Sequence, residues 1–234
     1  MNTKETRLQQ GITELRTRLL VMSASVGMAL DGACAALASG NTDQAEAIID
    51  GDTWINSMEN EIDELALDLL ALNQPVAYDV RFLVGALRMV IDLERIGDEA
   101  VSIAERSIIM QTRLEDPVKG ALQPLLEKAR ELFAEATEVF RASDTEAAMR
   151  LCRDDDESTR LEVGALQRIM DFVRADAAAG KEDAPYPVMQ GILICRALNR
   201  VCRRCANIAG HTYFIARGVN VKHLPHELRE AKGS

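Results

Sequence analysis

The sequence predicts an all-α protein built from two tandem three-helix bundles. No proline occurs before Pro75, and the six prolines lie far enough apart to leave long stretches free of this helix breaker. Those stretches are rich in Ala, Leu, Glu, Arg and Met, which favour helices. Aromatic residues make up 4% of the 234 residues, and the alternation typical of strands is missing. Since 47% of the residues are apolar, the chain can bury a sizeable core.

Three helices are expected in a first unit, residues 1–115. Turn residues Ser39-Gly40-Asn41 end the first helix, and capping oxygens at Thr42-Asp43 start the second, which has a weak point at Gly51. Pro75 opens the third helix, because proline is tolerated in a first turn. The expected helices cover residues 4–38, 42–73 and 75–111.

Three further helices are expected in a second unit, residues 116–234. The first of them begins between Pro117 and Pro124, Ser143-Asp144 can cap the next, and Gly218 closes the last. The segment 179–187 is expected to be a loop. The first of these helices is expected to end at residue 141, the second to cover 144–178 and the third to cover 187–217.

An internal repeat supports this duplicated arrangement. The segments 93–104 and 198–209 share a frame of Leu, Arg, an aliphatic residue and a final Ile-Ala at matching spacing. The acidic residues of the first copy are absent from the second. Long helices joined by short turns pack as antiparallel bundles, so each unit is expected to form one.

Charge and cysteine content exclude several classes of protein. The chain has 27 Lys and Arg against 37 Asp and Glu, a net charge of −10, which disfavours nucleic acid as a partner. Its five cysteines, an odd number, predict reduced thiols rather than a disulfide framework. No uninterrupted apolar run is long enough to span a membrane. We therefore expect a cytoplasmic protein.

Two pairs of acidic residues are the strongest candidate site. Glu59 and Asp63 are four residues apart, as are Glu94 and Asp98, so each pair shares one helix face. Like charges at this spacing destabilise a helix, and partial burial raises the cost unless a cation compensates. Four carboxylates from two adjacent helices suit a divalent cation. The apolar stripes expected beside them are Val80, Val84, Leu87 and Ile91 in the third helix and Ile55, Ile62, Ala66 and Leu69 in the second.

Several segments of the chain resemble the PhoU family, whose members regulate bacterial phosphate-specific transport. The segments are QPVAYDVR at 74–81, DLERIGD at 92–98, NSME at 56–59 with Asp63, and GVNVKH at 218–223. The resemblance implies tandem three-helix bundles with acidic motifs that hold a divalent or iron-type metal cluster. Carried over by position, the ligands of the first unit are Glu59, Asp63, Glu94 and Asp98.

The second unit departs from the family pattern. The resemblance places acids near residues 155, 159, 199 and 203, where this chain has Asp155, Thr159, Asn199 and Arg203. Only one of the four is acidic, and Arg203 brings a positive charge. We therefore predict one metal site, in the first unit, and an internal cation at Arg203 in place of the second.

The last helix carries an arginine cluster. One interpretation is a patch that binds an anion or a partner, since guanidinium groups suit phosphate and carboxylate. The interpretation we favour is salt bridging to acids of the preceding helix, at 154–157 and 162. The arginines are Arg196, Arg200, Arg203 and Arg204.

The remaining reactive side chains are expected to have structural roles. Cys202 and Cys205 are expected to be core residues rather than a redox or zinc pair. The histidines, His211, His223 and His226, are expected at caps or on the surface. Trp54 is expected to pack between helices near Gly51, although an exposed tryptophan could anchor a partner.

The resemblance implies a regulator that acts by contact and is not an enzyme. Its implied partners are the ATP-binding subunit of the phosphate ABC transporter and a phosphate-sensing histidine kinase, so it would meet the membrane only indirectly. It implies negative regulation and a homodimer. One alternative is a metal-free docking or scaffold protein of the same fold. A di-metal carboxylate enzyme is disfavoured, because all three histidines lie beyond residue 210 and none follows a glutamate by three.

Overall fold

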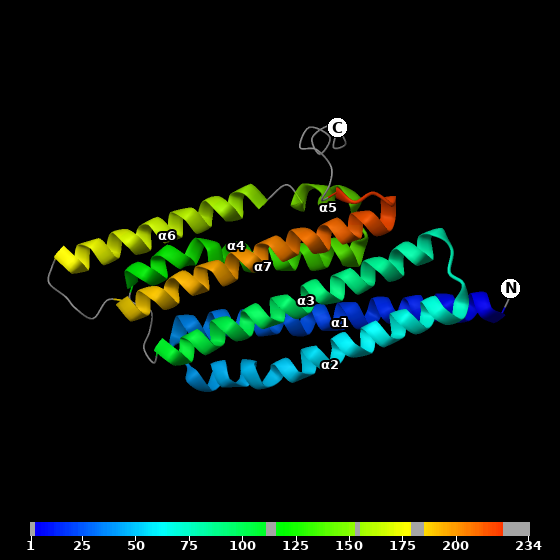
Figure 1. The fold of residues 1–234 in the computed structure, drawn as a ribbon, viewed down its shortest axis with the longest axis horizontal. Helices are drawn as coiled ribbons and strands as arrows, with labels where there is room; N and C mark the ends of the chain where they lie inside the picture. The colour runs from blue at the N-terminus through cyan, green and yellow to red at the C-terminus, as the bar shows by residue number, and fades with distance from the viewer. Residues whose placement is uncertain (1–2, 111–115, 153–154, 179–184, 222–234) are drawn as a thin grey trace.

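The computed structural model describes residues 3–110, 116–152, 155–178 and 185–221. These residues form α-helices and contain no strand, so the all-α prediction is confirmed. The long helices run side by side along the longest axis of an elongated molecule (Figure 1). Their bounds are α1 Thr3–Ser39, α2 Thr42–Asn73, α3 Ala77–Met110, α4 Asp116–Ala142, α5 Thr145–Leu151, α6 Asp155–Ala178 and α7 Pro185–Arg217.

The helices of the first unit begin and end close to the predicted residues, but α3 begins at Ala77, so Pro75 precedes the helix and is not in its first turn. The Asn41 side chain caps α2 by accepting a 3.1 Å hydrogen bond from the Gln44 amide. A left-handed Gln74, with φ 50°, ends this helix before Pro75. α2 continues through Gly51 without a break, so this glycine does not end the helix.

The second unit differs from the prediction in two places. α7 begins at Pro185, inside the loop predicted over 179–187, and residues 179–184 of that loop lie outside the described part. The single helix expected over 144–178 is two helices, α5 and α6, on either side of residues 153–154, which lie outside the described part. Asp144 caps α5 as predicted, accepting from the amides of Glu146 and Ala147. The acids from Asp155 onward start a new helix, because acidic side chains favour a helix N-terminus. The predicted boundary between residues 115 and 116 adjoins the undescribed segment 111–115 and stays a prediction.

The two halves meet along α3 and α7. α3 packs against α1 and α2 within its own half, and α7 packs against α4, α5 and α6. α3 and α7 also pack against each other, with a smaller contact between α1 and α4. Gly85 lets α3 and α7 approach closely, because a Cβ at this position would collide with Ile215.

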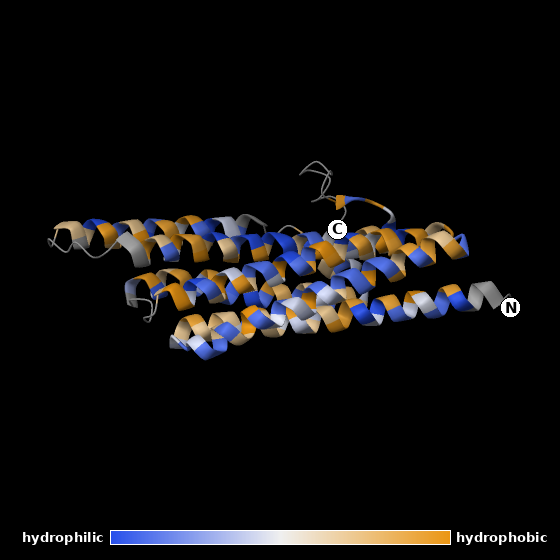
Figure 2. Cartoon of the chain, turned by 60° about the horizontal axis from the view of Figure 1, so that its bottom comes forward, coloured by the Kyte–Doolittle hydropathy of each residue, from blue (hydrophilic) through white to orange (hydrophobic). Residues whose placement is uncertain are grey.

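Each helix carries both polar and apolar residues, and the apolar ones supply the core (Figure 2). The core is one connected cluster that includes residues from both halves. Burial of this apolar surface is the main favourable term in folding. The largest fully buried side chains include Phe82, Phe140, Leu15, Leu19, Met22 and Met89.

Among the described residues, α1 alone is long and apolar enough to cross a membrane, with a window of mean hydropathy 1.6 within Arg7–Ser39. Half of that window is buried inside the fold. A core helix of a bundle meets the same criteria of length and composition, so this feature by itself is weak evidence for a membrane span.

Candidate functional site

The four predicted metal ligands lie on α2 and α3, beside the core. On α2 the predicted stripe is confirmed, since Ile55, Ile62, Ala66 and Leu69 are buried. On α3 the predicted stripe is wrong at its two ends, because Val80 is 36% and Ile91 43% exposed, whereas Leu87 packs against the core. The core face of α3 is instead formed by residues one to two positions away, among them Phe82, Leu83, Ala86, Met89, Val90 and Leu93.

Glu59, Asp63, Glu94 and Asp98 together form what we call the carboxylate ledge. Burial, and then the charges of Asp98 and Glu59, raise the pKa of Glu94 from 4.5 to about 7. Burial also raises the pKa of Glu59, with contributions from Asp63 and Asp98. The structure therefore brings the α2 and α3 carboxylates within electrostatic reach of each other. The pKa values of Asp63 and Asp98 are raised as well, in both cases chiefly by burial.

Asp52 is a fifth acid at this ledge, which the sequence analysis missed. Its charge helps to raise the pKa of Asp98, after burial. Asn56 donates a 2.9 Å hydrogen bond to its Oδ2 atom, while its Oδ1 atom is buried without a hydrogen-bond partner. Helical spacing could have revealed it, because Asp52 precedes Glu59 by seven residues and so shares its helix face.

The ledge has the donor chemistry for a metal ion but not a formed binding geometry. Its oxygen donors suit a hard cation, and Asp63 Oδ1 is another buried atom without a partner. Within the described residues, however, no three His, Cys, Asp or Glu side chains converge on one point as a metal site requires. Carboxylate rotamers would have to turn for several of them to bind one ion.

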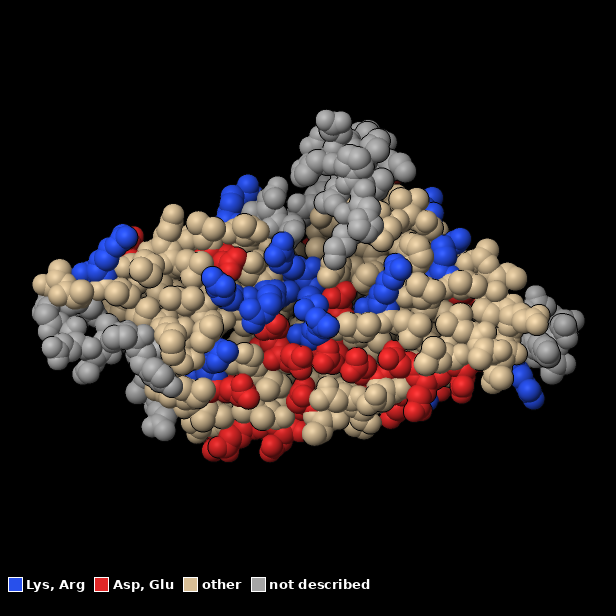
Figure 3. Space-filling view, in the orientation of Figure 1, with Lys and Arg blue, Asp and Glu red and all other residues tan. Residues whose placement is uncertain are grey.

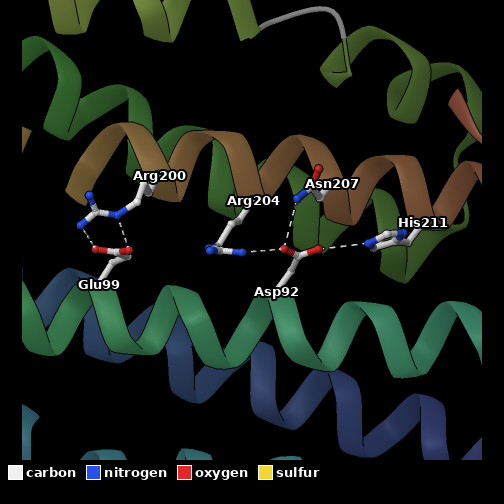
Figure 4. Close-up of polar contacts among 6 residues, drawn as sticks. All are labelled: Asp92, Glu99, Arg200, Arg204, Asn207 and His211. Atoms are coloured by element: carbon white, nitrogen blue, oxygen red, sulfur yellow. Dashed lines mark hydrogen bonds and ion pairs between the residues drawn. The ribbon is translucent and has the colours of Figure 1, made fainter. Parts of the chain in front are cut away.

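Two arginines of α7, Arg200 and Arg204, have partners other than those predicted. Arg200 forms two hydrogen bonds to Glu99, of 2.5 and 2.6 Å, and Arg204 donates a 3.0 Å hydrogen bond to Asp92 (Figure 4). Both acids lie on α3, so these two salt bridges join the halves of the molecule. The favoured interpretation, salt bridges to the helix before α7, is wrong for both arginines.

The acids of α6 have other partners where the structure describes them. Glu162 accepts a 2.5 Å hydrogen bond from Asn199, and Glu157 pairs with Lys128 at 2.7 Å. Residue 154 lies outside the described part, and the side chains of 155 and 156 are likewise not described.

Asp92 is a buried hub that the sequence analysis missed. Besides Arg204, it accepts a 3.2 Å hydrogen bond from Asn207 and lies 3.0 Å from His211 Nε2. Burial alone would raise the pKa of Asp92, but the bonds from His211, Asn207 and Arg204 outweigh it and lower the pKa. The cap or surface role predicted for His211 is therefore wrong. The signal in the sequence that could have identified Asp92 is its position directly before the repeated Leu-x-Arg frame.

Three arginines of the cluster, Arg196, Arg200 and Arg203, are exposed on α7. In Figure 3 a group of basic side chains lies directly beside a belt of acidic ones on the same face of the molecule. Since Glu99 binds Arg200 and Asp92 binds Arg204, these two arginines of the cluster are not available to an external anion.

The other candidates are placed as follows. Cys202 and Cys205 are buried in the core, which confirms their predicted role, and none of the five cysteines, all of which lie in the described part, forms a disulfide. Burial raises the pKa of the Cys195 thiol to about 12, so this thiol is unreactive at neutral pH. The packing predicted for Trp54 is wrong, because its side chain is 58% exposed. His223 and His226 lie outside the described residues.

The fold and the ledge define a class of duplicated helical-bundle protein with an acidic surface site on the first repeat. Residues 19–107 and 122–212 each match the sequence model of the PhoU domain. The chain belongs to the PhoU family.

Relatives of known name are similar over most of their length. A "phosphate-specific transport system accessory protein PhoU homolog" from Pseudomonas putida is 30% identical over 215 residues, 91% of this chain and 82% of the relative. The Escherichia coli K12 protein named "phosphate-specific transport system accessory protein PhoU" is 26% identical, over 91% of this chain and 86% of its own length.

Solved structures have the same fold. The crystal structure of PhoU from Pseudomonas aeruginosa superposes with a TM-score of 0.84 at 29% identity, covering 90% of this chain and 99% of that one. PhoU from Streptococcus pneumoniae has a TM-score of 0.82 at 23% identity, covering 92% of this chain and 99% of that one, which shows the fold alone.

Proposed function

We propose that this protein is a non-enzymatic accessory regulator of phosphate-specific transport. The observation that carries this proposal is the match of both repeats to the PhoU domain, together with similarity over 91% of the chain to proteins named as accessory proteins of that system. A regulator of this kind acts by binding other proteins, so its surface rather than an enclosed pocket carries the function.

The finer proposal concerns the partners. The protein binds the ATP-binding subunit of the phosphate ABC transporter and a phosphate-sensing histidine kinase, acting in the cytoplasm as a homodimer and as a negative regulator of phosphate-starvation genes. The support is the resemblance of segments 74–81 and 92–98 to the family signature. Contact with the membrane is indirect, through these partners.

We also propose that the carboxylate ledge binds a divalent or iron-type cation. Glu59, Asp63, Glu94 and Asp98 would hold it, with Asp52 close enough to contribute. A bound cation supplies positive charge that neutralises the mutual repulsion of these carboxylates. The raised pKa of Glu94 and the unpartnered Oδ1 atom of Asp63 support this role.

The regulatory proposal is tested by complementation. A strain lacking its own PhoU protein receives this gene, and phosphate uptake and a phosphate-starvation reporter are measured at high phosphate. We expect lower uptake and repression of the reporter. In parallel, the tagged protein is used in pull-downs at high and low phosphate, probed for the transporter ATPase subunit and the kinase. Unchanged uptake and retention of neither partner would contradict the proposal.

A second candidate function is a metal-free docking surface for a basic partner. The absence of a converging set of ligands among the described residues favours it. Metal analysis of protein purified without chelator separates the two roles, using Glu94→Ala with Asp98→Ala. The matched control is Glu131→Ala with Glu135→Ala, an exposed pair at the same spacing on α4. Loss of stoichiometric metal in the first double variant alone supports the metal site.

A further inference from the structure

The middle of α1 presents an apolar stripe to solvent. Residues 19–30 contain no charged side chain. One side of this segment is buried, including Leu19, Met22 and Val26. On the other side Val21 is 51% and Met28 68% exposed. A solvated helix face normally carries polar residues, so core packing does not explain this stripe.

The stripe leads into a hollow between α1 and α2 with a volume of about 140 Å³. Trp54, the single tryptophan of the chain, is one of its lining residues and remains 58% exposed. Arg18 lies at its rim, paired with Glu14 at 2.7 Å and Glu61 at 2.8 Å. We call this hollow the α1–α2 groove, and its uncharged lining residues are Thr17, Val21, Trp54, Met58 and Ile62.

The charge around the groove limits what can fill it. Between Thr42 and Asn73, α2 carries nine Asp and Glu residues and no Lys or Arg, and six of the nine are not at the carboxylate ledge. This negative field repels anionic lipid headgroups and attracts a positively charged polypeptide. Exposed apolar patches bordered by charge are typical of protein interaction sites, and exposed tryptophan is a frequent energetic anchor there.

We propose that the α1–α2 groove binds a basic amphipathic helix of a partner protein, with an apolar side chain seated against Val21 and Trp54. The Lys and Arg residues of that helix lie over the acids of α2. This is the binding mode in which an apolar helix face enters a groove. The proposal does not rest on the proposed function in phosphate transport, and the groove contains none of the carboxylate ledge residues.

A peptide of defined chemistry tests the groove directly. The probe is a fluorescein-labelled, tryptophan-free helix of Leu and Lys, and its counterpart has Glu at every Lys position. We expect the Leu/Lys peptide to bind with a one-to-one endpoint in fluorescence anisotropy. Trp54 emission should shift to the blue as its ring is covered. The Leu/Glu peptide should not bind.

Two variants with equal charge separate groove docking from general attraction to an acidic surface. Val21→Asp and Leu67→Asp each add one negative charge at an exposed apolar residue. Leu67 follows Met58 by nine residues and so lies on the opposite side of α2. Groove docking predicts at least tenfold weaker binding for Val21→Asp and less than threefold change for Leu67→Asp. Equal effects of the two variants would overturn the proposal.

Further measurements cover the remaining outcomes. Trp54→Ala should also weaken peptide binding at least tenfold, which keeps the test valid if Val21→Asp fails to fold. Vesicles of phosphatidylglycerol and phosphatidylcholine should leave Trp54 emission unchanged, and a blue shift on vesicles would overturn the proposal in favour of a membrane surface. Dilution of the protein alone should not change Trp54 emission. A change on dilution would assign the groove to a second copy of the chain instead.

Discussion

α3 carries two sets of acids whose environments differ. Asp92 and Glu99 face α7, where arginines neutralise both. Glu94 and Asp98 face α2, where the pKa of each is raised, chiefly by burial. One helix therefore supplies both the neutralised contact between the halves and an acidic ledge whose repulsion Arg95 offsets only in part. Asp92 and Glu94 are two residues apart, so their side chains point about 200° apart around α3. This difference in direction gives Asp92 a structural role and makes Glu94 a candidate for binding.

The two repeats also differ in the charge of the residues at equivalent positions. The frame aligns Glu94 with Asn199 and Asp98 with Arg203. Asn199 donates a hydrogen bond to Glu162, whereas Glu94 lies beside other acids. The apolar frame fixes the bundle in both halves, so the positions between its residues are free to change their charge.

Removing the hub of the contact between the halves should have the largest effect. Asp92→Ala leaves Arg204 and Asn207 without their partner in a buried site, which should lower the free energy of unfolding by about 3 kcal/mol. Urea denaturation followed by circular dichroism measures this. Glu138→Ala is the control, because it breaks only an exposed pair with Arg141, and it should cause no measurable change.

A paired substitution tests whether charge neutralisation explains the effect of Asp92. Asp92→Leu with Arg204→Met should recover most of the lost stability, since buried ion pairs can be replaced by apolar pairs of similar size. A double variant no more stable than Asp92→Ala would show that His211 and Asn207, rather than Arg204, determine the role of Asp92.

The second contact between the halves should contribute less. Arg200 is 47% exposed on its side chain, and solvent weakens its pair with Glu99. Glu99→Gln keeps the shape and removes the charge, so the free energy of unfolding should fall by about 1 kcal/mol. The same denaturation measurement applies, with Glu105→Gln as an exposed control on α3. A loss as large as that of Asp92→Ala would contradict the difference in burial between the two salt bridges.

The ledge should respond in the opposite direction. Glu94→Gln removes one of the repelling charges, so in chelator-treated protein it should raise the free energy of unfolding by about 1 kcal/mol, a value reduced for solvent screening. The measurement is thermal unfolding at pH 8, where the pKa of about 7 leaves Glu94 mostly ionised. A lower melting temperature for Glu94→Gln without metal would show that no repulsion is stored at the ledge.

Local signals predicted much of the fold. Asp144 caps α5 as predicted, and Gly218, with φ 70°, ends α7. The cap of α2 is Asn41, one residue before the predicted Thr42-Asp43. The break between α5 and α6 was missed because helix propensity continues across 144–178, while the acids beginning at Asp155 favour a new start.

The site was only partly predictable. The spacing of four residues placed each ledge pair on one helix face. It cannot show which acids of α3 form a salt bridge to an arginine of a neighbouring helix. Asp92 and Glu99 differ from Glu94 and Asp98 only in their rotation about α3. Their arginine partners lie about a hundred residues away on α7, so only the packing of the two halves identifies these pairs.

The smallest expected effect concerns the proposed internal cation. Arg203→Glu places an acid where the frame of the first repeat has Asp98. Since Arg203 is exposed on α7, the free energy of unfolding should fall by no more than about 0.5 kcal/mol. Arg196→Glu is the matched control, because it makes the same charge change at another exposed position of α7. A loss of stability for Arg203→Glu several times that of Arg196→Glu would support an internal cation in place of a metal. Equal losses would leave the second repeat stabilised by its apolar frame and by its arginine contacts to α3.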